Sequence, residues 1–126
     1  MKLRGIRGAI TVNKNTKEEI LSATRELLLE IFNTNQINSE DVGGIFFTAT
    51  SDLNSVYPAQ AARELGWTQI PLLCYQEMEV AGSLQHCIRV MVLWNTTLEQ
   101  EKIKHVYLKG ATQLRPDLVI EEKHYD

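Results

Sequence analysis

Two arginines stand in stretches of the sequence that are otherwise apolar. Arg89 lies in the middle of residues 87–94, which read Cys-Ile-Arg-Val-Met-Val-Leu-Trp, and Arg7 lies in an equally apolar segment near the N-terminus. The commonest explanation of an arginine in a strand is a solvent-facing guanidinium whose stem covers apolar surface. A guanidinium keeps its proton, however, so one that is buried must have anionic or strongly polar partners. Both arginines are therefore candidates for binding an anion.

Three further residues could complete such a site. Glu77 follows an apolar segment, Tyr107 interrupts the apolar pair Val-Leu, and Arg115 stands in Leu-Arg-Pro-Asp. Taken singly, an acid of this kind is usually solvated or ion-paired, and a tyrosine usually packs at the edge of a core. Taken together with Arg7 and Arg89, these residues predict a pocket for a small polyanion such as a dicarboxylate.

Several common site motifs are absent from the sequence. It contains no G-x-x-x-x-G-K-[ST] or G-x-G-x-x-G loop, and no C-x-x-C or H-E-x-x-H pair. Its three histidines, at positions 86, 105 and 124, do not have the spacing of metal ligands. We therefore expect no metal site, no nucleotide loop, no cofactor and no nucleophilic triad.

Composition excludes other classes of function. The 126 residues are 44% hydrophobic and 23% charged, which is typical of a globular domain, and the net charge of −3 disfavours general nucleic-acid binding. No apolar run has the length of a membrane span, and the basic N-terminus lacks the apolar core of a signal peptide. The two cysteines, Cys74 and Cys87, are too few for a disulfide framework, so we expect reduced thiols in a cytoplasmic protein.

Hydrophobic periodicity predicts the elements that must position these residues. Residues 2–12 alternate, with Arg7 flanked by Gly5 and Ala9 on one face, which leaves room beside its guanidinium. Thr16 and Glu19 form a capping box that opens a helix ending near residues 33–35. A second, short helix is expected over residues 58–65, and further strands over residues 45–50, 70–75, 87–94 and 104–109.

This order predicts an α+β fold, a mixed sheet of about five strands with two helices on one face. We expect one domain over residues 1–126, with a polar tail that is mobile after about residue 117. The other face of the sheet would lack cover, and a small domain of this kind often completes its core by oligomerising. A homo-oligomer is therefore expected.

Five separated segments in the same order resemble one enzyme family over nearly the whole chain. They begin with Arg-Gly-Ile-Arg-Gly-Ala at 4–9 and Pro-Ala-Gln-Ala-Ala-Arg-Glu-Leu at 58–65, followed by Gln-Glu-Met-Glu-Val at 76–80 and Cys-Ile-Arg-Val-Met at 87–91. The last comprises His-Val-Tyr-Leu at 105–108 and Leu-Arg-Pro-Asp-Leu at 114–118. These segments resemble the monofunctional chorismate mutases of the trimeric pseudo-α/β-barrel class, and the strand-rich pattern does not resemble the all-helical class.

The resemblance implies a homotrimer with active sites between subunits and chorismate as the substrate. The family rearranges chorismate to prephenate, an intramolecular Claisen-type reaction in phenylalanine and tyrosine biosynthesis, by selecting a reactive conformer and stabilising the charge that develops on the ether oxygen. By resemblance, Arg89 donates to that oxygen, Arg7 binds a substrate carboxylate and assists there, and Glu77 accepts from the ring hydroxyl.

The resemblance also implies a set of substrate-binding residues. Tyr107 matches a phenol that contacts a carboxylate, and Arg115 a basic residue that closes over the site. The remaining matches line the wall and entrance of the cleft: Tyr57, Ala59, Gln60, Arg63, Leu73 and Cys74. Gln60 stands where some relatives carry a lysine, and Tyr57 where a phenylalanine is familiar. Strict alternation places Cys74 and Glu77 on opposite faces, so the strand must either contain a bulge near residue 75 or end before Glu77.

Two alternatives remain open. One is a trimer that binds a small anionic metabolite or deaminates imines in a similar cleft between subunits, because fold does not determine function. The other is a protein-interaction module that uses Trp67 or Trp94, which predicts an exposed aromatic patch and no buried arginine. Convergence of Arg7, Glu77, Arg89 and Tyr107 on one cleft would favour the mutase.

Overall fold

The computed structural model describes residues 1–114; the predictions for Arg115 and for the tail lie outside these residues. These residues form five strands and two α-helices, in the order β1 (Lys2–Thr11), α1 (Lys17–Asn35), β2 (Val42–Ala49), α2 (Ala59–Glu64), β3 (Leu72–Gln76), β4 (Cys87–Thr96) and β5 (Val106–Leu108). Three short 3₁₀ helices accompany them: η1 (Ser39–Asp41), η2 (Gln100–Lys102) and η3 (Lys109–Gln113).

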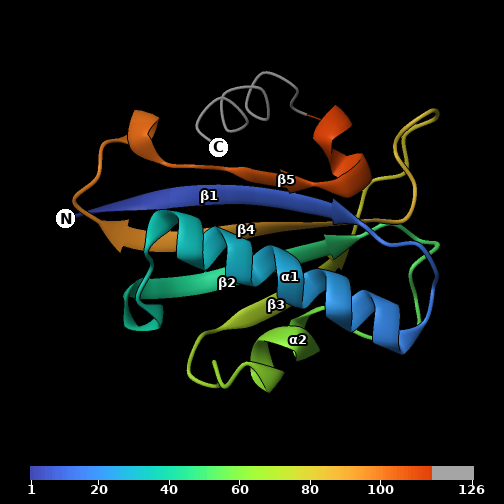
Figure 1. Cartoon of the computed structure of the whole chain (residues 1–126), viewed down its shortest axis with the longest axis horizontal. Helices are drawn as coiled ribbons and strands as arrows, with labels where there is room; N and C mark the ends of the chain where they lie inside the picture. The colour runs from blue at the N-terminus through green and yellow to red at the C-terminus, as the bar shows by residue number, and fades with distance from the viewer. Residues whose placement is uncertain (115–126) are drawn as a thin grey trace.

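The sheet is mixed, with strand order β3-β2-β4-β1-β5 (Figure 1). The central strand β4 runs antiparallel to both of its neighbours, β1 and β2, whereas β5 is parallel to β1 and β3 is parallel to β2. Figure 1 shows α1 lying across one face of this sheet, with α2 beside β3. The predicted α+β class, with a five-stranded mixed sheet and two helices, is confirmed.

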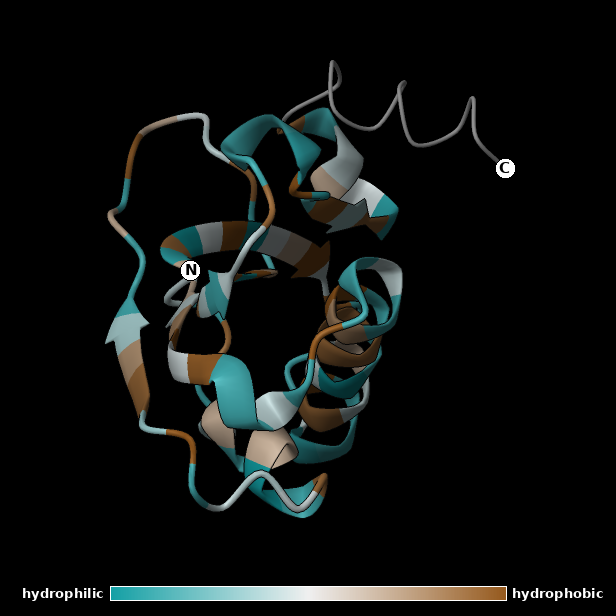
Figure 2. Ribbon diagram, turned by 90° about the vertical axis from the view of Figure 1, so that its left-hand side faces the viewer, coloured by the Kyte–Doolittle hydropathy of each residue, from teal (hydrophilic) through white to brown (hydrophobic). Residues whose placement is uncertain are grey.

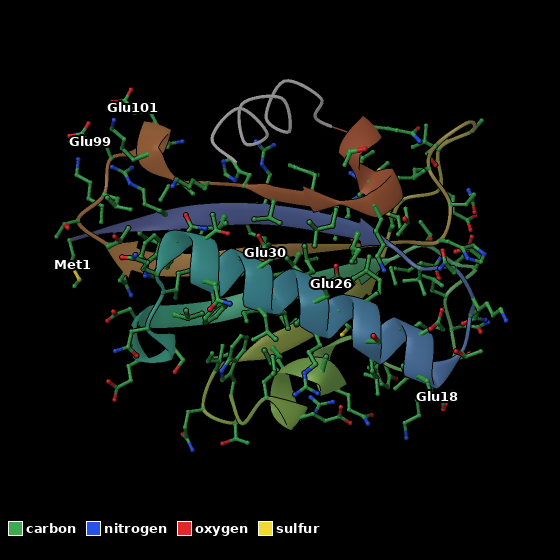
Figure 3. The ribbon with its side chains drawn as sticks, viewed as in Figure 1. Met1, Glu18, Glu26, Glu30, Glu99 and Glu101 are labelled. Atoms are coloured by element: carbon green, nitrogen blue, oxygen red, sulfur yellow. The ribbon has the colours of Figure 1, made fainter. Side chains whose placement is uncertain are left out.

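The long helix α1 begins where the capping box predicts. The side chain of Thr16 accepts a hydrogen bond from the backbone N–H of Glu19, which satisfies one of the free donors at the helix start. Gln36 ends the helix in the left-handed conformation (φ 55°), with its N–H bonded to the last turn. In Figure 2 hydrophobic and hydrophilic residues alternate in stripes along the helix, and in Figure 3 Glu18, Glu26 and Glu30 project from it into solvent.

Period-two alternation divides the sheet into two different faces. Ile6, Ile45, Ile88 and Val92 face the helices and are completely buried in the main core, together with the inner stripe of α1 and part of α2. We call the opposite side, which neither helix covers, the open face. Side chains one position along each strand point to it, and Arg7 is among them.

Both tryptophans belong to the helix-covered side. Trp94 is 6% exposed, and the ring of Trp67 stacks on Phe32 of α1 with 4.0 Å between ring centroids. The alternative of an interaction module built on these residues requires an exposed aromatic patch that they do not form.

The structure differs from the predicted elements mainly at strand ends. The strand expected over residues 104–109 is formed only by Val106–Leu108, because the Asn35 side chain takes both backbone groups of Lys104: Nδ2 donates to its carbonyl at 2.9 Å and Oδ1 accepts from its N–H at 2.9 Å. At the other end, Lys109 has a φ of 54°, which a strand residue does not adopt. None of the helices within residues 1–114 is both long enough and apolar enough to cross a membrane.

Candidate active site

Strand register brings the polar residues of the open face into rows across the sheet. Arg89 on β4 is the direct partner of Ala9 on β1 and of Thr48 on β2. Ala9 is in turn the partner of Tyr107 on β5. Tyr107, Ala9, Arg89 and Thr48 therefore follow one another on four adjacent strands, about 5 Å apart.

A pocket of about 360 Å³ opens above this row. It contains the four residues whose convergence the sequence analysis required, from four different elements: Arg7, Glu77, Arg89 and Tyr107. The rest of its lining is mostly apolar and comprises Gly8, Ala9, Phe46, Thr48, Val90, Met91 and Leu114. A small, mostly apolar pocket with a few convergent charges is the usual form of a metabolite site.

Glu77 lies just past the end of β3, on the side of the sheet that carries the pocket. The register between β2 and β3 is regular up to Gln76, and the N–H of Glu77 then donates to the carbonyl of Ala49 at 2.9 Å. Its side chain continues the alternation of Leu73 and Tyr75 and points to the open face, whereas Cys74 packs against the core on the helix-covered side. β3 ends at Gln76, before Glu77, and contains no bulge, but the opposed faces of Cys74 and Glu77 follow from alternation alone.

Glu77 and Arg89 form the charged centre of the pocket. Arg89 Nε lies 2.8 Å from Glu77 Oε1, yet the N–H is not directed at this oxygen, so the contact is an ion pair without an aligned hydrogen bond. The Arg89 side chain is 40% exposed although its Nε is buried. The head of the guanidinium therefore faces the pocket while its base is fixed against the carboxylate.

Cys87 lies below this pair on the open face, in a small cluster with Ala9, Tyr107 and Ala111. It is 1% exposed. Burial raises the pKa of its thiol, an effect that the nearby Arg89 cation partly offsets. Cys87 is therefore a neutral, buried group at neutral pH, not a nucleophile.

Arg7 is positioned by the pairing of its backbone. Its N–H donates to Nδ1 of His105 at 3.0 Å, just before the point where β5 begins to pair with β1. Within residues 1–114, no carboxylate lies in ion-pair range of its guanidinium. The pocket thus has two arginines for one glutamate, an excess of positive charge that favours an anionic ligand.

The small neighbours of Arg7 have separate roles. Ala9 is completely buried and lines the pocket beside Arg89. The space beside Gly5 is filled instead by Met91, whose sulfur would lie 2.9 Å from a Cβ at that position. Met91 is the strand partner of Arg7, so it lies beside the arginine on the open face and forms part of the pocket wall.

A hydrogen-bonded cluster anchors the segment between β3 and β4 that carries Glu77. The Asp52 carboxylate accepts the backbone N–H of His86 at 3.0 Å and the hydroxyl of Thr50. The same hydroxyl accepts the N–H of Cys87 at 3.0 Å, at the first residue of β4. Nearby, Ser51 donates to Glu79. These bonds tie both ends of the segment to the loop after β2.

The other predicted substrate-binding residues do not line this pocket. Tyr57 is 72% exposed before α2, Gln60 bonds to Glu64 on the helix surface, and Arg63 is exposed. Leu73 faces outward on the edge strand β3 and is 53% exposed. Ala59 and Cys74 are on the helix-covered side, where burial raises the pKa of the Cys74 thiol. Their role in binding stays a prediction, and Arg115 is outside the described residues.

Sequence reasoning missed several residues that line the pocket, among them Phe46, Thr48, Met91 and Leu114. Alternation along residues 45–50 could have placed Phe46 and Thr48 on the face opposite Ile45. Within residues 1–114, no three histidine, cysteine or acidic side chains gather closely enough to hold a metal ion.

Comparisons with known proteins all indicate the same family. The family described as chorismate mutase type I matches residues 3–118. A chorismate mutase AroH from Thermus thermophilus is 52% identical over 117 residues, covering 92% of this chain and 96% of the relative. The one from Bacillus subtilis is 50% identical over 119 residues, 94% of each. A solved chorismate mutase from Clostridium thermocellum superposes with a TM-score of 0.85 at 48% identity, covering 86% of this chain and 97% of that one.

Proposed function

The chain belongs to the type I chorismate mutase family and is an isomerase of aromatic biosynthesis, and we propose that the open-face pocket is the centre at which it rearranges chorismate to prephenate. The observation that carries this proposal is the convergence of Arg7, Glu77, Arg89 and Tyr107 in one pocket. The two arginines provide charge for a substrate with two carboxylates, and the apolar lining excludes water from its ring.

The reaction needs positioned charge and no proton transfer. The ether C–O bond breaks as a new C–C bond forms within the same molecule, so no atom is gained or lost and negative charge develops on the ether oxygen. We propose that the terminal nitrogens of Arg89 donate to that oxygen, because its Nε is buried against the Glu77 carboxylate while the head of the guanidinium faces the pocket. A donor held in place before the reaction stabilises the developing charge without reorganisation.

The other three residues would hold the reactive conformer. Arg7 has no carboxylate partner of its own among the described residues and would bind a substrate carboxylate, assisting at the ether oxygen. The phenol of Tyr107 would contact a carboxylate from the edge strand β5. Glu77 would accept the ring hydroxyl. Holding both reacting ends of a flexible substrate together lowers the entropic part of the barrier.

We further propose that the working form is a homotrimer in which each pocket is completed by a neighbouring subunit. Two observations support this. Leu73 and Tyr75 are each 53% exposed on the open face, an apolar surface suited to a partner. Tyr57 and Arg63 lie at the β3 edge of the sheet, four strands and about 19 Å from β5. In a trimer, Tyr57 and Arg63 of one chain could reach the pocket of a neighbouring chain, although they do not line the pocket of their own chain.

The two free thiols, Cys74 and Cys87, are consistent with the reducing cytoplasm, which we propose as the compartment.

Light scattering on the purified protein tests the proposed trimer and should give a mass three times the 14.4 kDa of the chain. A monomer that is fully active would refute the shared site.

The direct test of function is incubation of the purified protein with chorismate, following loss of its ultraviolet absorbance and identifying the product. We expect prephenate, and we expect its formation to collapse in Arg89→Ala. A folded wild-type oligomer without turnover would contradict the mutase assignment and favour a trimer that only binds an anionic metabolite through the same arginines.

A further inference from the structure

Glu77 depends on side-chain contacts for its position, because it stands just past the end of a strand. Its backbone is attached to the sheet by one hydrogen bond, to the carbonyl of Ala49. The side chain is 24% exposed. Its carboxylate has two partners within residues 1–114, and both contact the same oxygen, Oε1: Arg89 Nε at 2.8 Å and Thr48 Oγ1 at 3.1 Å.

The two contacts differ in what they can determine. The Arg89 N–H is not aligned with Oε1, so this ion pair attracts the carboxylate without defining its rotation. The Thr48 hydroxyl donates a proper hydrogen bond and, among the described residues, is the side chain that gives Glu77 an orientation. Thr48 is also well suited to this task. It stands on β2 directly opposite Arg89 on β4, and its β-branched side chain has little rotamer freedom.

We propose that Thr48 is a positioning residue for the rearrangement, an inference that rests on the proposed function of the pocket. Its hydroxyl holds Oε1 of Glu77 so that Oε2 stays available to a substrate hydroxyl. Without it, the carboxylate rotates toward the guanidinium and closes a two-point ion pair with Arg89, the geometry that carboxylate and guanidinium prefer. That pairing would occupy the terminal nitrogens that the reaction needs.

The test compares two substitutions of one side chain in the full-length protein. Thr48→Val keeps the shape and removes the hydroxyl, whereas Thr48→Ser keeps the hydroxyl and removes the methyl group. We expect Thr48→Val to lower kcat with chorismate roughly tenfold, with a smaller change in KM, as follows from the loss of one hydrogen bond to a charged group. We expect Thr48→Ser to remain within about threefold of the wild type. Thr48→Ala serves as the second hydroxyl-free variant if the valine variant does not fold.

A matched control removes the same kind of bond elsewhere. Thr34 Oγ1 donates to Glu30 Oε1 at 3.4 Å on α1, on the other side of the sheet. Thr34→Val should leave kcat unchanged. A double-mutant cycle adds a readout that a merely structural role would not affect: in a Glu77→Ala background, Thr48→Val should cause almost no further loss of kcat.

Each outcome has a distinct meaning. Wild-type protein that does not form prephenate overturns the proposed function itself. Active wild type with Thr48→Val at the wild-type kcat overturns the role of Thr48 alone. Equal losses in the valine and serine variants, or additive losses in the Glu77→Ala background, would show that packing and not the hydroxyl is responsible.

Discussion

Replacing Arg89 by lysine separates the charge of this residue from its geometry. In the wild type the guanidinium has three nitrogens, and one of them, Nε, is buried 2.8 Å from Glu77 Oε1, in ion-pair contact. Two terminal nitrogens therefore remain for the substrate. Lysine keeps the positive charge but has a single nitrogen on a flexible stem. In Arg89→Lys, Glu77 and the ether oxygen compete for this single nitrogen. We expect it to pair with the Glu77 carboxylate, which is charged and is present before the substrate binds.

The expected effect follows from the number of donors lost at the reacting oxygen. Removing one preorganised donor to a developing oxyanion costs about a hundredfold to a thousandfold in kcat, or about 2.7 to 4 kcal/mol. The Arg89 side chain is 40% exposed in the single chain, so water partly screens its charge there. We therefore expect the lower end, about a hundredfold in kcat for Arg89→Lys. KM should change much less, because in the proposed mechanism Arg7 would still bind the substrate carboxylate.

The assay is steady-state consumption of chorismate by the folded protein, with identification of prephenate. Arg4→Lys is the matched control. Arg4 is an arginine of β1 whose Nε also has an oxygen partner, the carbonyl of Leu98 at 3.1 Å, but it does not line the pocket. It should stay within about twofold of the wild type. If Arg89→Lys kept kcat within threefold of the wild type, a positive charge alone would be sufficient. The proposal that the reaction needs the terminal nitrogens of Arg89 in addition to the contact with Glu77 would then be refuted.

Three further predictions concern stability, measured by urea unfolding. Gly8→Ala places a Cβ 2.6 Å from Ile31 Cδ1 and should lower the free energy of unfolding by about 1 to 3 kcal/mol, whereas Gly43→Ala, with its nearest contact at 4.0 Å, should not show this overpacking. Asp52→Ala leaves a backbone N–H before β4 without its acceptor and should cost about 1 to 3 kcal/mol; an unchanged midpoint would refute the anchoring role. Burial raises the pKa of the Cys87 thiol above its ordinary 9.0, so its contribution is intact below about pH 9 and is lost as pH rises through the raised value. Cys87→Ala should therefore flatten the alkaline decline in stability, and an identical pH profile would contradict this.

Local patterns in the sequence were sufficient to predict the order of the helices and strands and to assign residues of β1 to one face of the sheet or the other. Alternation along residues 2–12 placed Arg7 and Ala9 together opposite Ile6, and the capping box placed the start of α1 correctly. The apolar neighbours of Arg89 marked it as unusual, and the structure puts it in the pocket. These features depend on neighbours within a few positions of the chain, where periodicity and capping apply.

The remaining features depend on long-range pairing that no local pattern contains. The strand at 104–109 is shortened by Asn35, a residue 69 positions away. The position of Glu77 depends on the register between β2 and β3, and Thr48 has no distinguishing signal because threonine is an ordinary strand residue. Tyr57 does not line the pocket of the single chain, so the prediction for it rests on the proposed trimer.

The two charged residues at the centre of the pocket are held in different ways, Arg89 by the sheet and Glu77 by the segment after β3. Arg89 is on the central strand, hydrogen-bonded on both sides through β1 and β2, so its backbone cannot shift without breaking two ladders. Glu77 is on a segment past a strand end and depends on Thr48 and on the Asp52 cluster for its position. A rearrangement without proton transfer is most sensitive to the group that faces the developing charge. The fold thus holds Arg89, the residue proposed for that role, on a strand paired on both sides. Substitutions around Glu77 should reduce kcat by smaller steps, because they disturb the orientation of the charged pair and leave the charge of Arg89 in place.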